Sequence, residues 1–286
     1  MTTPRMSSAD TVDPGPPLTH DAVRAAADRL ARAAATGVPC TPVRDLIGSS
    51  DIRAAYEVQS VLTAQRLAAG ARRVGRKIGL TSAVVQKQLG VGQPDFGFLF
   101  DDMRLAGGDV ISMTRLLQPK VEAEVAFVLA EDLASGPLDA RSVRSAVAYL
   151  VAAIEVVDSR VAGWDITLGD TVADNASSGL FVLGPQRRTL DQVEPADVSM
   201  AMTVDGELVS SGDGRACLGD PLNALAWLAN TALDLGEPLR AGEVILSGAL
   251  GPMHPIHPGS LVRADISGLG SVSARISHHP LPEEGR

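Results

Sequence analysis

The most informative segment of the sequence is Pro119-Lys120-Val121-Glu122-Ala123-Glu124-Val125-Ala126-Phe127-Val128-Leu129. Its β-branched and aromatic residues recur with a period of two, which is typical of a β-strand. The odd positions form a continuous apolar face, whereas the even positions include Glu122 and Glu124 before they become apolar. The stretch therefore predicts a largely buried strand that carries two carboxylates side by side on one face.

Two interpretations of this acidic pair stay open at this point. Side chains two residues apart on a strand lie about 7 Å from each other, so the like charges repel. Each carboxylate also costs free energy to desolvate unless it is paired. A divalent cation is the simplest partner for both, and an edge strand with its acidic face in water is the alternative.

Composition excludes several classes of protein. The 286 residues suit one large domain, or a core domain with a smaller helical part. A formal charge of −9 without a basic cluster argues against nucleic-acid binding. No apolar run approaches the length of a membrane span, and the N-terminus lacks a secretory signal. Cys40 and Cys217 match no metal or redox spacing, so we expect ordinary thiols in a reducing cytoplasm.

The order of predicted elements indicates an α+β protein, because many strands in meanders alternate with a few helices. We expect a disordered leader over residues 1–17, a helical part over 18–72 and a strand-rich catalytic domain over 73–280. The helical part contains helices over 21–35 and 51–69, the latter with Ser50 as its N-cap. The remaining expected elements are helices over 82–89 and 139–149 and from Asp220, strands over 74–80, 151–158 and 244–248, and hairpins over 198–210 and 261–276.

A third carboxylate, Glu155, lies in the middle of the apolar run 151–158. A single acid inside such a run needs a partner. Three carboxylates favour a hard cation such as Mg²⁺ or Mn²⁺, which keeps open positions for substrate oxygens. The alternative for Glu155 is an ion pair with Arg160 or Lys120.

Lys77 and Asp95 are candidate proton carriers. A partly buried lysine has a lowered pKa and can act as an acid or base near neutrality. The alternatives are a lysine that extends to water and an aspartate that caps a turn after Pro94.

The histidines and the sequence motifs of other enzyme classes give weaker signals. His254 and His257 have a spacing that can ligate a metal, but Pro255 and Pro258 predict a loop, and the role of these histidines stays open. No nucleophile elbow, P-loop or dinucleotide-binding motif is present.

Several segments in a fixed order resemble the 2-keto-4-pentenoate hydratase family. They include Gly75-Arg76-Lys77-Ile78-Gly79-Leu80-Thr81-Ser82, Gln93-Pro94-Asp95-Phe96-Gly97, Val121-Glu122-Ala123-Glu124, Asp174-Asn175-Ala176-Ser177 and the segments 85–90, 153–160 and 245–253. The resemblance covers about residues 20–277. It implies a fumarylacetoacetase-type β-roll with packed helices and a large homo-oligomer.

The resemblance also implies roles for particular residues. The family's metal ligands map onto Glu122, Glu124 and Glu155, and its acid/base pair onto Lys77 and Asp95. Contacts on the substrate side are expected from Asn175, Ser177, Ser178, Ser247 and Gly248. The assignment of water activation to Lys77 or to Asp95 stays open.

The activity implied is metal-dependent addition of water to 2-hydroxypenta-2,4-dienoate, or a close homologue, in the meta-cleavage catabolism of aromatic compounds. The product is 4-hydroxy-2-oxopentanoate, and association with the next aldolase or a decarboxylase of the pathway is a further expectation. One alternative is a 4-oxalocrotonate-type decarboxylase, which needs a second cationic site, with Arg72, Arg73 and Arg76 as candidates. The other is a non-catalytic partner subunit of a pathway enzyme.

Overall fold

The computed structural model describes residues 19–82, 86, 91–105 and 109–277. The predicted leader over 1–17 lies outside these residues, and so does most of the helix predicted over 82–89. In the described part of the chain, the helices are too short or too polar to cross a bilayer.

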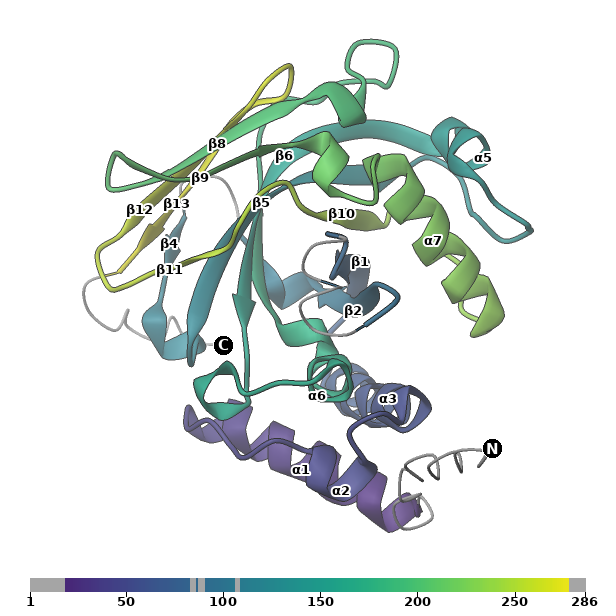
Figure 1. Ribbon diagram of the computed structural model, residues 1–286, viewed down its shortest axis with the longest axis vertical. Coiled ribbons are helices and arrows are strands. Elements are labelled where there is room, and N and C mark those ends of the chain that lie inside the picture. The colour runs from purple at the N-terminus through teal and green to yellow at the C-terminus, as the bar shows by residue number, and fades with distance from the viewer. Residues whose placement is uncertain (1–18, 83–85, 87–90, 106–108, 278–286) are drawn as a thin grey trace, which may run out of the picture.

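A long, curved sheet forms the centre of the molecule and contains the opening strand, β5 (Figure 1). Its strands follow the order β2, β1, β10, β5, β6, β7, β3, and β11 pairs with the beginning of β5. Glu122 of β5 lies directly opposite Glu155 of β6, so the two side chains share a face. The bounds are β1 Arg73–Gly79, β2 Asp95–Phe100, β3 Arg104–Leu105, β5 Pro119–Leu129, β6 Val147–Asp158, β7 Ser178–Leu183, β10 Val244–Ala249 and β11 His254–Pro255.

A second sheet packs against β6 and β7, with the strand order β4, β13, β12, β8, β9. Its bounds are β4 Val110–Ile111, β8 Ser199–Val204, β9 Glu207–Asp213, β12 Leu261–Ile266 and β13 Gly270–Ile276. Both predicted hairpins are present, since β8 pairs with β9 and β12 with β13. One continuous apolar core lies between the sheets, and the predicted α+β class with rolled sheets is confirmed.

Helices cover the central sheet at two places (Figure 1). Their bounds are α1 His20–Thr36, α2 Arg44–Ile47, α3 Ile52–Ala68, α5 Ala140–Ser145, α6 Leu168–Ala173 and α7 Pro221–Asp234. Helices α1, α3 and α6 form a layer with its own apolar core, whereas α7 packs against β10 and α5. Gln59 of α3 ties the layer to the sheet, because its amide donates to the carbonyls of Phe96 (2.9 Å) and Val172 (3.0 Å).

The structure corrects two details of the predicted elements. The helix predicted over 139–149 ends at Ser145, because Val147 and Tyr149 pair with β5 as the start of β6. The N-cap of α3 is Asp51 rather than Ser50, since the Asp51 carboxylate accepts a hydrogen bond from the Ala54 amide. The predicted domain boundary at residue 73 stays a prediction. Helix α6 comes after this boundary in the sequence, yet its Val172 and Ala173 belong to the apolar core of the helical layer.

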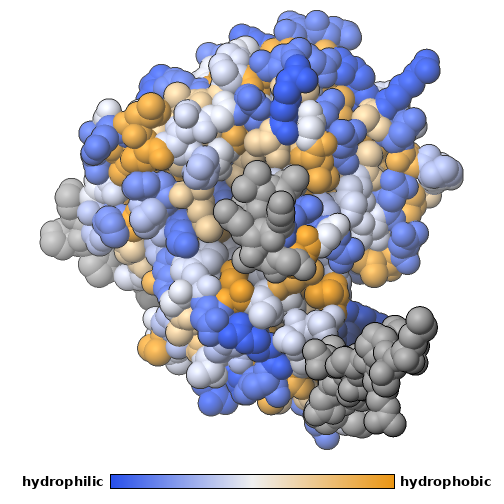
Figure 2. All heavy atoms as spheres, in the orientation of Figure 1, coloured by the Kyte–Doolittle hydropathy of each residue, from blue (hydrophilic) through white to orange (hydrophobic). Residues whose placement is uncertain are grey.

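Exposed apolar side chains are scattered over the surface. On the face shown in Figure 2, hydrophobic residues form small groups among hydrophilic ones. Leu208 of β9, Leu261 of β12 and Val110 of β4 are exposed on the second sheet. The homo-oligomer stays a prediction.

Strand β2 touches the turn Asn175–Ser177 at very short range. The side-chain amide of Asn175 accepts from the Phe98 amide (2.8 Å) and donates to the Phe98 carbonyl (3.0 Å), as a neighbouring strand would. A Cβ atom at Gly97 would lie 2.2 Å from the carbonyl oxygen of Asn175. Glycine at position 97 is therefore what allows the turn to reach the sheet.

We expect Gly97→Ala to lower the free energy of unfolding by about 2 kcal/mol, because the new methyl group must displace a backbone carbonyl. Urea denaturation followed by circular dichroism measures this change. Gly92→Ala is the matched control, since a Cβ atom there meets open space. Equal stability of the two variants would contradict the close approach.

Candidate active site

Strands β5 and β6 bring the three predicted carboxylates together. Glu122, Glu124 and Glu155 each offer an oxygen, and these oxygens lie within 4.8 Å of one another. Glu124 and Glu155 are buried, whereas Glu122 is partly exposed. The cluster is therefore closed on the side of Glu124 and Glu155 and reaches solvent beside Glu122.

The buried oxygens of this cluster have fewer partners than buried carboxylates need, although Lys77 forms an ion pair with Oε1 of Glu155. Within the described residues, Oε1 of Glu124 and both carboxylate oxygens of Glu155 accept no hydrogen bond. Oε2 of Glu124 accepts one from the backbone amide of Gly248 (2.8 Å). Unsatisfied buried oxygens are costly, and an all-oxygen set of this size suits a hard divalent cation. The three residues therefore fit the predicted metal.

Lys77 and Asp95 join the same face of the sheet from β1 and β2. Asp95 pairs with Gly79, two residues from Lys77, so both side chains point to one side. Nζ of Lys77 lies 3.1 Å from Oε1 of Glu155. Lys77 is 3% exposed, which excludes a lysine that reaches water, and Asp95 is buried and begins strand β2 instead of lying in a turn. Lys77 is also the partner of Glu155, in place of Arg160 or Lys120.

Burial and mutual repulsion raise the pKa values of these acids. Burial raises the pKa of Glu122 to about 7, with Lys77 opposing the shift and Glu155 adding to it. Burial raises the pKa of Asp95 to about 6, again against the attraction of Lys77. The pKa of Glu124 rises well above its usual value through burial and repulsion from Glu155 and Glu122.

The predicted lowering of the Lys77 pKa is wrong for the metal-free protein. Burial does act to lower this pKa, but the surrounding carboxylates, Glu155 and Asp95 first among them, outweigh it and the net shift is upward. A dication held by the same carboxylates competes for their charge and so weakens this upward shift.

The residues predicted to contact substrate fall into two groups. Ser247 and Gly248 lie beside Glu124, and within the described residues the buried Oγ of Ser247 has no hydrogen-bond partner. Asn175, Ser177 and Ser178 belong to or follow the turn next to β2, and each side chain has a partner within the protein. These partners are the backbone of Phe98 for Asn175, Thr171 for Ser177 and the carbonyl of Asn175 for Ser178. The substrate role of both groups stays a prediction.

Gly248 allows the backbone to reach Glu124. Its φ of 106° is one that other residues rarely adopt, and a Cβ atom there would collide with the side chain of Thr81. The buried thiol of Cys217 lies 2.9 Å from the Gly248 carbonyl, and burial raises its pKa to about 12, so it stays neutral. No local pattern predicts this contact, because the two residues are 31 positions apart.

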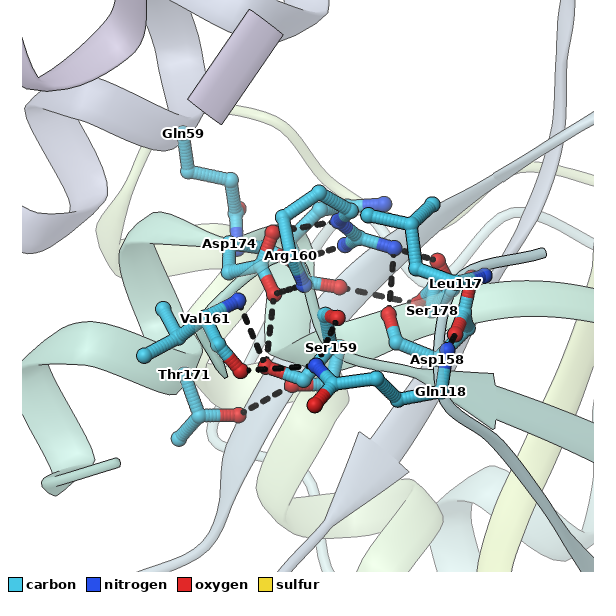
Figure 3. Close-up of polar contacts among 12 residues, drawn as sticks. Gln59, Leu117, Gln118, Asp158, Ser159, Arg160, Val161, Thr171, Asp174 and Ser178 are labelled. Atoms are coloured by element: carbon cyan, nitrogen blue, oxygen red, sulfur yellow. Dashed lines mark hydrogen bonds and ion pairs between the residues drawn. The ribbon is translucent and has the colours of Figure 1, made fainter. Parts of the chain in front are cut away.

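A polar network fixes the end of β6, three residues beyond Glu155 (Figure 3). The guanidinium of Arg160 pairs with Asp174 and donates to the carbonyl of Ser178 (2.8 Å). The Asp158 carboxylate accepts from the amides of Leu117 (2.8 Å) and Gln118 (2.6 Å) at the approach to β5. The two strands that carry the three glutamates are thereby held in register.

The histidines lie outside the carboxylate cluster. His254 in β11 pairs with Val121, whose side chain is on the face opposite Glu122. Across the described ranges, no histidine belongs to a group of metal-ligating side chains with these glutamates.

Residues 75–277 match the fumarylacetoacetate (FAA) hydrolase C-terminal family. The chain is 52% identical over 269 residues to the "TodF product hydratase" of Pseudomonas putida, covering 94% of this chain and 98% of the relative. It is 51% identical over 247 residues to a 2-keto-4-pentenoate hydratase of Paraburkholderia xenovorans, and this match covers 86% of this chain and 92% of the relative. The 4-oxalocrotonate decarboxylase from Pseudomonas putida G7, complexed with magnesium and adipate, has a similar structure, with a TM-score of 0.87, 34% identity and coverage of 91% and 98%.

We expect the metal-free protein to lose thermal stability as the pH rises from about 5 to about 7.5. A carboxyl group whose pKa is raised on folding favours the folded state below its unfolded pKa, and that contribution disappears as the pH passes the folded pKa. For Glu122 this window runs from 4.5 to about 7. Calorimetry of chelator-treated protein measures the change, and saturating Mg²⁺ or Mn²⁺ at the upper pH should restore several degrees.

Glu122→Gln is the matched variant for this experiment, because it removes the titrating group and keeps the shape of the side chain. Its metal-free melting temperature should vary less over the same pH range. A wild-type melting temperature that rises with pH and ignores added metal would contradict the carboxylate cluster as the cause.

Proposed function

The chain belongs to the fumarylacetoacetate hydrolase C-terminal family, and we propose that it is a 2-keto-4-pentenoate hydratase. It adds water to 2-hydroxypenta-2,4-dienoate, or a close homologue, and releases 4-hydroxy-2-oxopentanoate in the meta-cleavage breakdown of aromatic compounds. The supporting observation is 51% identity, over 86% of this chain, to a 2-keto-4-pentenoate hydratase, in a chain that brings three carboxylates together.

Glu122, Glu124 and Glu155 are the residues that hold a divalent cation in this proposal, with Mg²⁺ or Mn²⁺ as the candidates. Such a cation supplies Lewis acidity, which stabilises negative charge on the substrate oxygens. Glu124, Glu155 and Ser247 are buried, so this side of the cluster is closed to bulk water.

Lys77 and Asp95 carry the protons of the reaction. Water addition requires one group that takes a proton from water and one that gives a proton to carbon. The pKa of Asp95, raised by burial to about 6, suits a group that accepts a proton near neutrality. Lys77 is held protonated by the surrounding carboxylates and so has a proton to give.

The arginines that would favour a dicarboxylate substrate have other partners. Arg72 pairs with Asp101, and Arg73 pairs with Glu237 and lies over the ring of Phe98. Arg76 alternates with Lys77 along β1, which puts its side chain on the opposite face of the sheet, where it donates to the carbonyl of Glu237 (2.7 Å). This arrangement favours a monoacid over the decarboxylase alternative.

The proposal also includes a cytoplasmic homo-oligomer. The product of the proposed reaction is a 4-hydroxy-2-oxo acid, which is a substrate for aldol cleavage. An aldolase is therefore the expected next enzyme and a candidate partner.

We expect metal-loaded protein to consume 2-hydroxypenta-2,4-dienoate, with loss of diene absorbance and no release of CO₂. The assay compares this monoacid with its alkyl homologues and with a 2-oxo-3-enedioate. CO₂ release from the diacid as the faster reaction would identify a decarboxylase instead. Absence of turnover on every compound by the isolated, metal-loaded protein would favour the partner-subunit alternative.

We expect Lys77→Met to lower kcat by about 10²-fold to 10⁴-fold, because a positioned proton donor is lost. The variant should still bind Mn²⁺, since Lys77 is not a ligand and its positive charge opposes the cation. Stopped-flow absorbance measures kcat, and electron paramagnetic resonance of Mn²⁺ measures occupancy. An unchanged kcat would remove Lys77 from the reaction.

A further inference from the structure

Lys120 lies at the solvent side of the carboxylate cluster. It precedes Glu122 by two residues on β5, so both side chains project from the same face, about 7 Å apart along the strand. Both are partly exposed, whereas Glu124, two residues further along, is fully buried. The order Lys120, Glu122, Glu124 thus runs from solvent into the site.

The ammonium of Lys120 lies over an aromatic ring, and the carboxylate whose charge acts on it, Glu122, forms no ion pair with it. Its Nζ lies 4.2 Å from the centroid of the Trp164 ring. Within the described residues it makes no hydrogen bond or ion pair. Many of the protein's arginines, by contrast, are paired with carboxylates, such as Arg66 with Asp102. The positive charge of Lys120 is therefore fixed in place and still available to an anion.

The loop after β6 holds Trp164 in this position. Gly163 and Trp164 both have left-handed backbone conformations, with φ of 65° and 58°. A bulky residue rarely adopts such a conformation, and residues that do so cluster at functional sites. The indole N–H of Trp164 donates to the carbonyl of Gln118 (3.0 Å), which fixes the plane of the ring.

The side chain of Gln118 clamps the same loop to the approach of β5. Its Nε2 donates to the carbonyls of Ser159 (3.0 Å) and Val161 (2.8 Å) (Figure 3). Its Oε1 accepts from the amide of Gly163 (2.7 Å). The nitrogen and the oxygen of this amide thus both hold the loop. The ring below Lys120 is thus a rigid platform.

The negative charge of the carboxylate cluster explains why a fixed ammonium is useful beside it. Four carboxylates face Lys77, and a divalent cation does not fully neutralise them when all are ionised. An anionic substrate approaching through the open side beside Glu122 meets this residual negative charge. A fixed ammonium at that side offsets the repulsion and can donate a charge-assisted hydrogen bond to a carboxylate.

We propose that Lys120, positioned on Trp164, binds the substrate carboxylate at the metal-chelating end of the molecule and so determines affinity for 2-hydroxy- and 2-oxo-acids. The proposal rests on the function proposed above, since it assumes an anionic substrate at the glutamate cluster. It assigns Lys120 a role in binding and leaves proton transfer to Lys77 and Asp95.

The test measures binding of oxalate, a non-reacting chelating dianion, to full-length protein saturated with Mg²⁺. Isothermal titration calorimetry gives the Kd for wild type, Lys120→Met and Lys120→Arg. We expect Lys120→Met to weaken oxalate binding about tenfold, the usual effect of losing one charge-assisted hydrogen bond. Lys120→Arg, which keeps the charge and can stack on Trp164, should stay within about threefold of wild type.

Kinetics provide the second readout. KM for the dienoate should rise in Lys120→Met by about the same factor as the oxalate Kd, with kcat nearly unchanged. The dependence of kcat/KM on ionic strength should also become weaker, because a charge that attracts the substrate is gone.

Arg187→Met is the matched control. Arg187 lies over the ring of Tyr149 (4.6 Å), so the substitution removes the same charge from the same kind of contact. Tyr149 pairs with Val128, which is six residues from Glu122 along β5, or about 20 Å. This variant should bind oxalate like wild type.

Several outcomes would overturn the proposal: an unchanged oxalate Kd in Lys120→Met, an equal loss in Arg187→Met, loss of bound Mg²⁺ in Lys120→Met, or a defect confined to dicarboxylate substrates. The proposed function fails separately. If oxalate binding depends on Lys120 but the protein does not hydrate the dienoate, this inference is supported and the hydratase function is rejected. If the protein hydrates the dienoate but oxalate binding does not depend on Lys120, the hydratase function is supported and this inference is rejected.

Discussion

Repulsion among buried carboxylates is the constraint on which the rest of this structure depends. Glu122 and Glu155 lie directly opposite each other on neighbouring strands, with Glu124 one step further and Asp95 on the same face. A pairing of like charges is unfavourable in any ordinary sheet. Here the ammonium of Lys77 compensates part of the charge, and the remaining oxygens require a cation or protons. The raised pKa values express the same constraint.

Tight packing around the site keeps these charges from separating. Arg160 and Asp174 fix the loop after β6, Gln59 ties the helical layer to β2, and Asn175 pairs with the backbone of Phe98. Each of these groups is polar, lies near the site and is satisfied by protein partners. Among the buried polar atoms without a hydrogen-bond partner in the described residues are oxygens of Glu124, Glu155 and Asp95, three residues that the proposed chemistry uses.

The two lysines on this face have different surroundings and therefore suit different tasks. Lys77 is buried among carboxylates, which hold its proton firmly until another cation competes for them. Lys120 lies over an indole ring, forms no ion pair in the described structure and stands on the open side. The first environment suits proton transfer inside the site, and the second suits attraction of an anion from solvent.

Local sequence patterns were sufficient to predict strand β5, the hairpins and the helices α1, α3 and α7, because each has a local period or a capping residue that needs no distant partner. It also singled out Glu122, Glu124 and Glu155, since an acid within an apolar run is conspicuous. The resemblance to a family assigned a catalytic role to Lys77 and Asp95. Their local patterns alone are also typical of a lysine that extends to water and an aspartate that caps a turn. Three findings could come only from the folded protein. Five side chains from β1, β2, β5 and β6 share one face, namely Lys77, Asp95, Glu122, Glu124 and Glu155. Lys77 gains proton affinity there instead of losing it, and Trp164 lies under Lys120. Those facts depend on strand order and register, which join residues far apart in the chain, and on the electrostatic field that arises only when they meet.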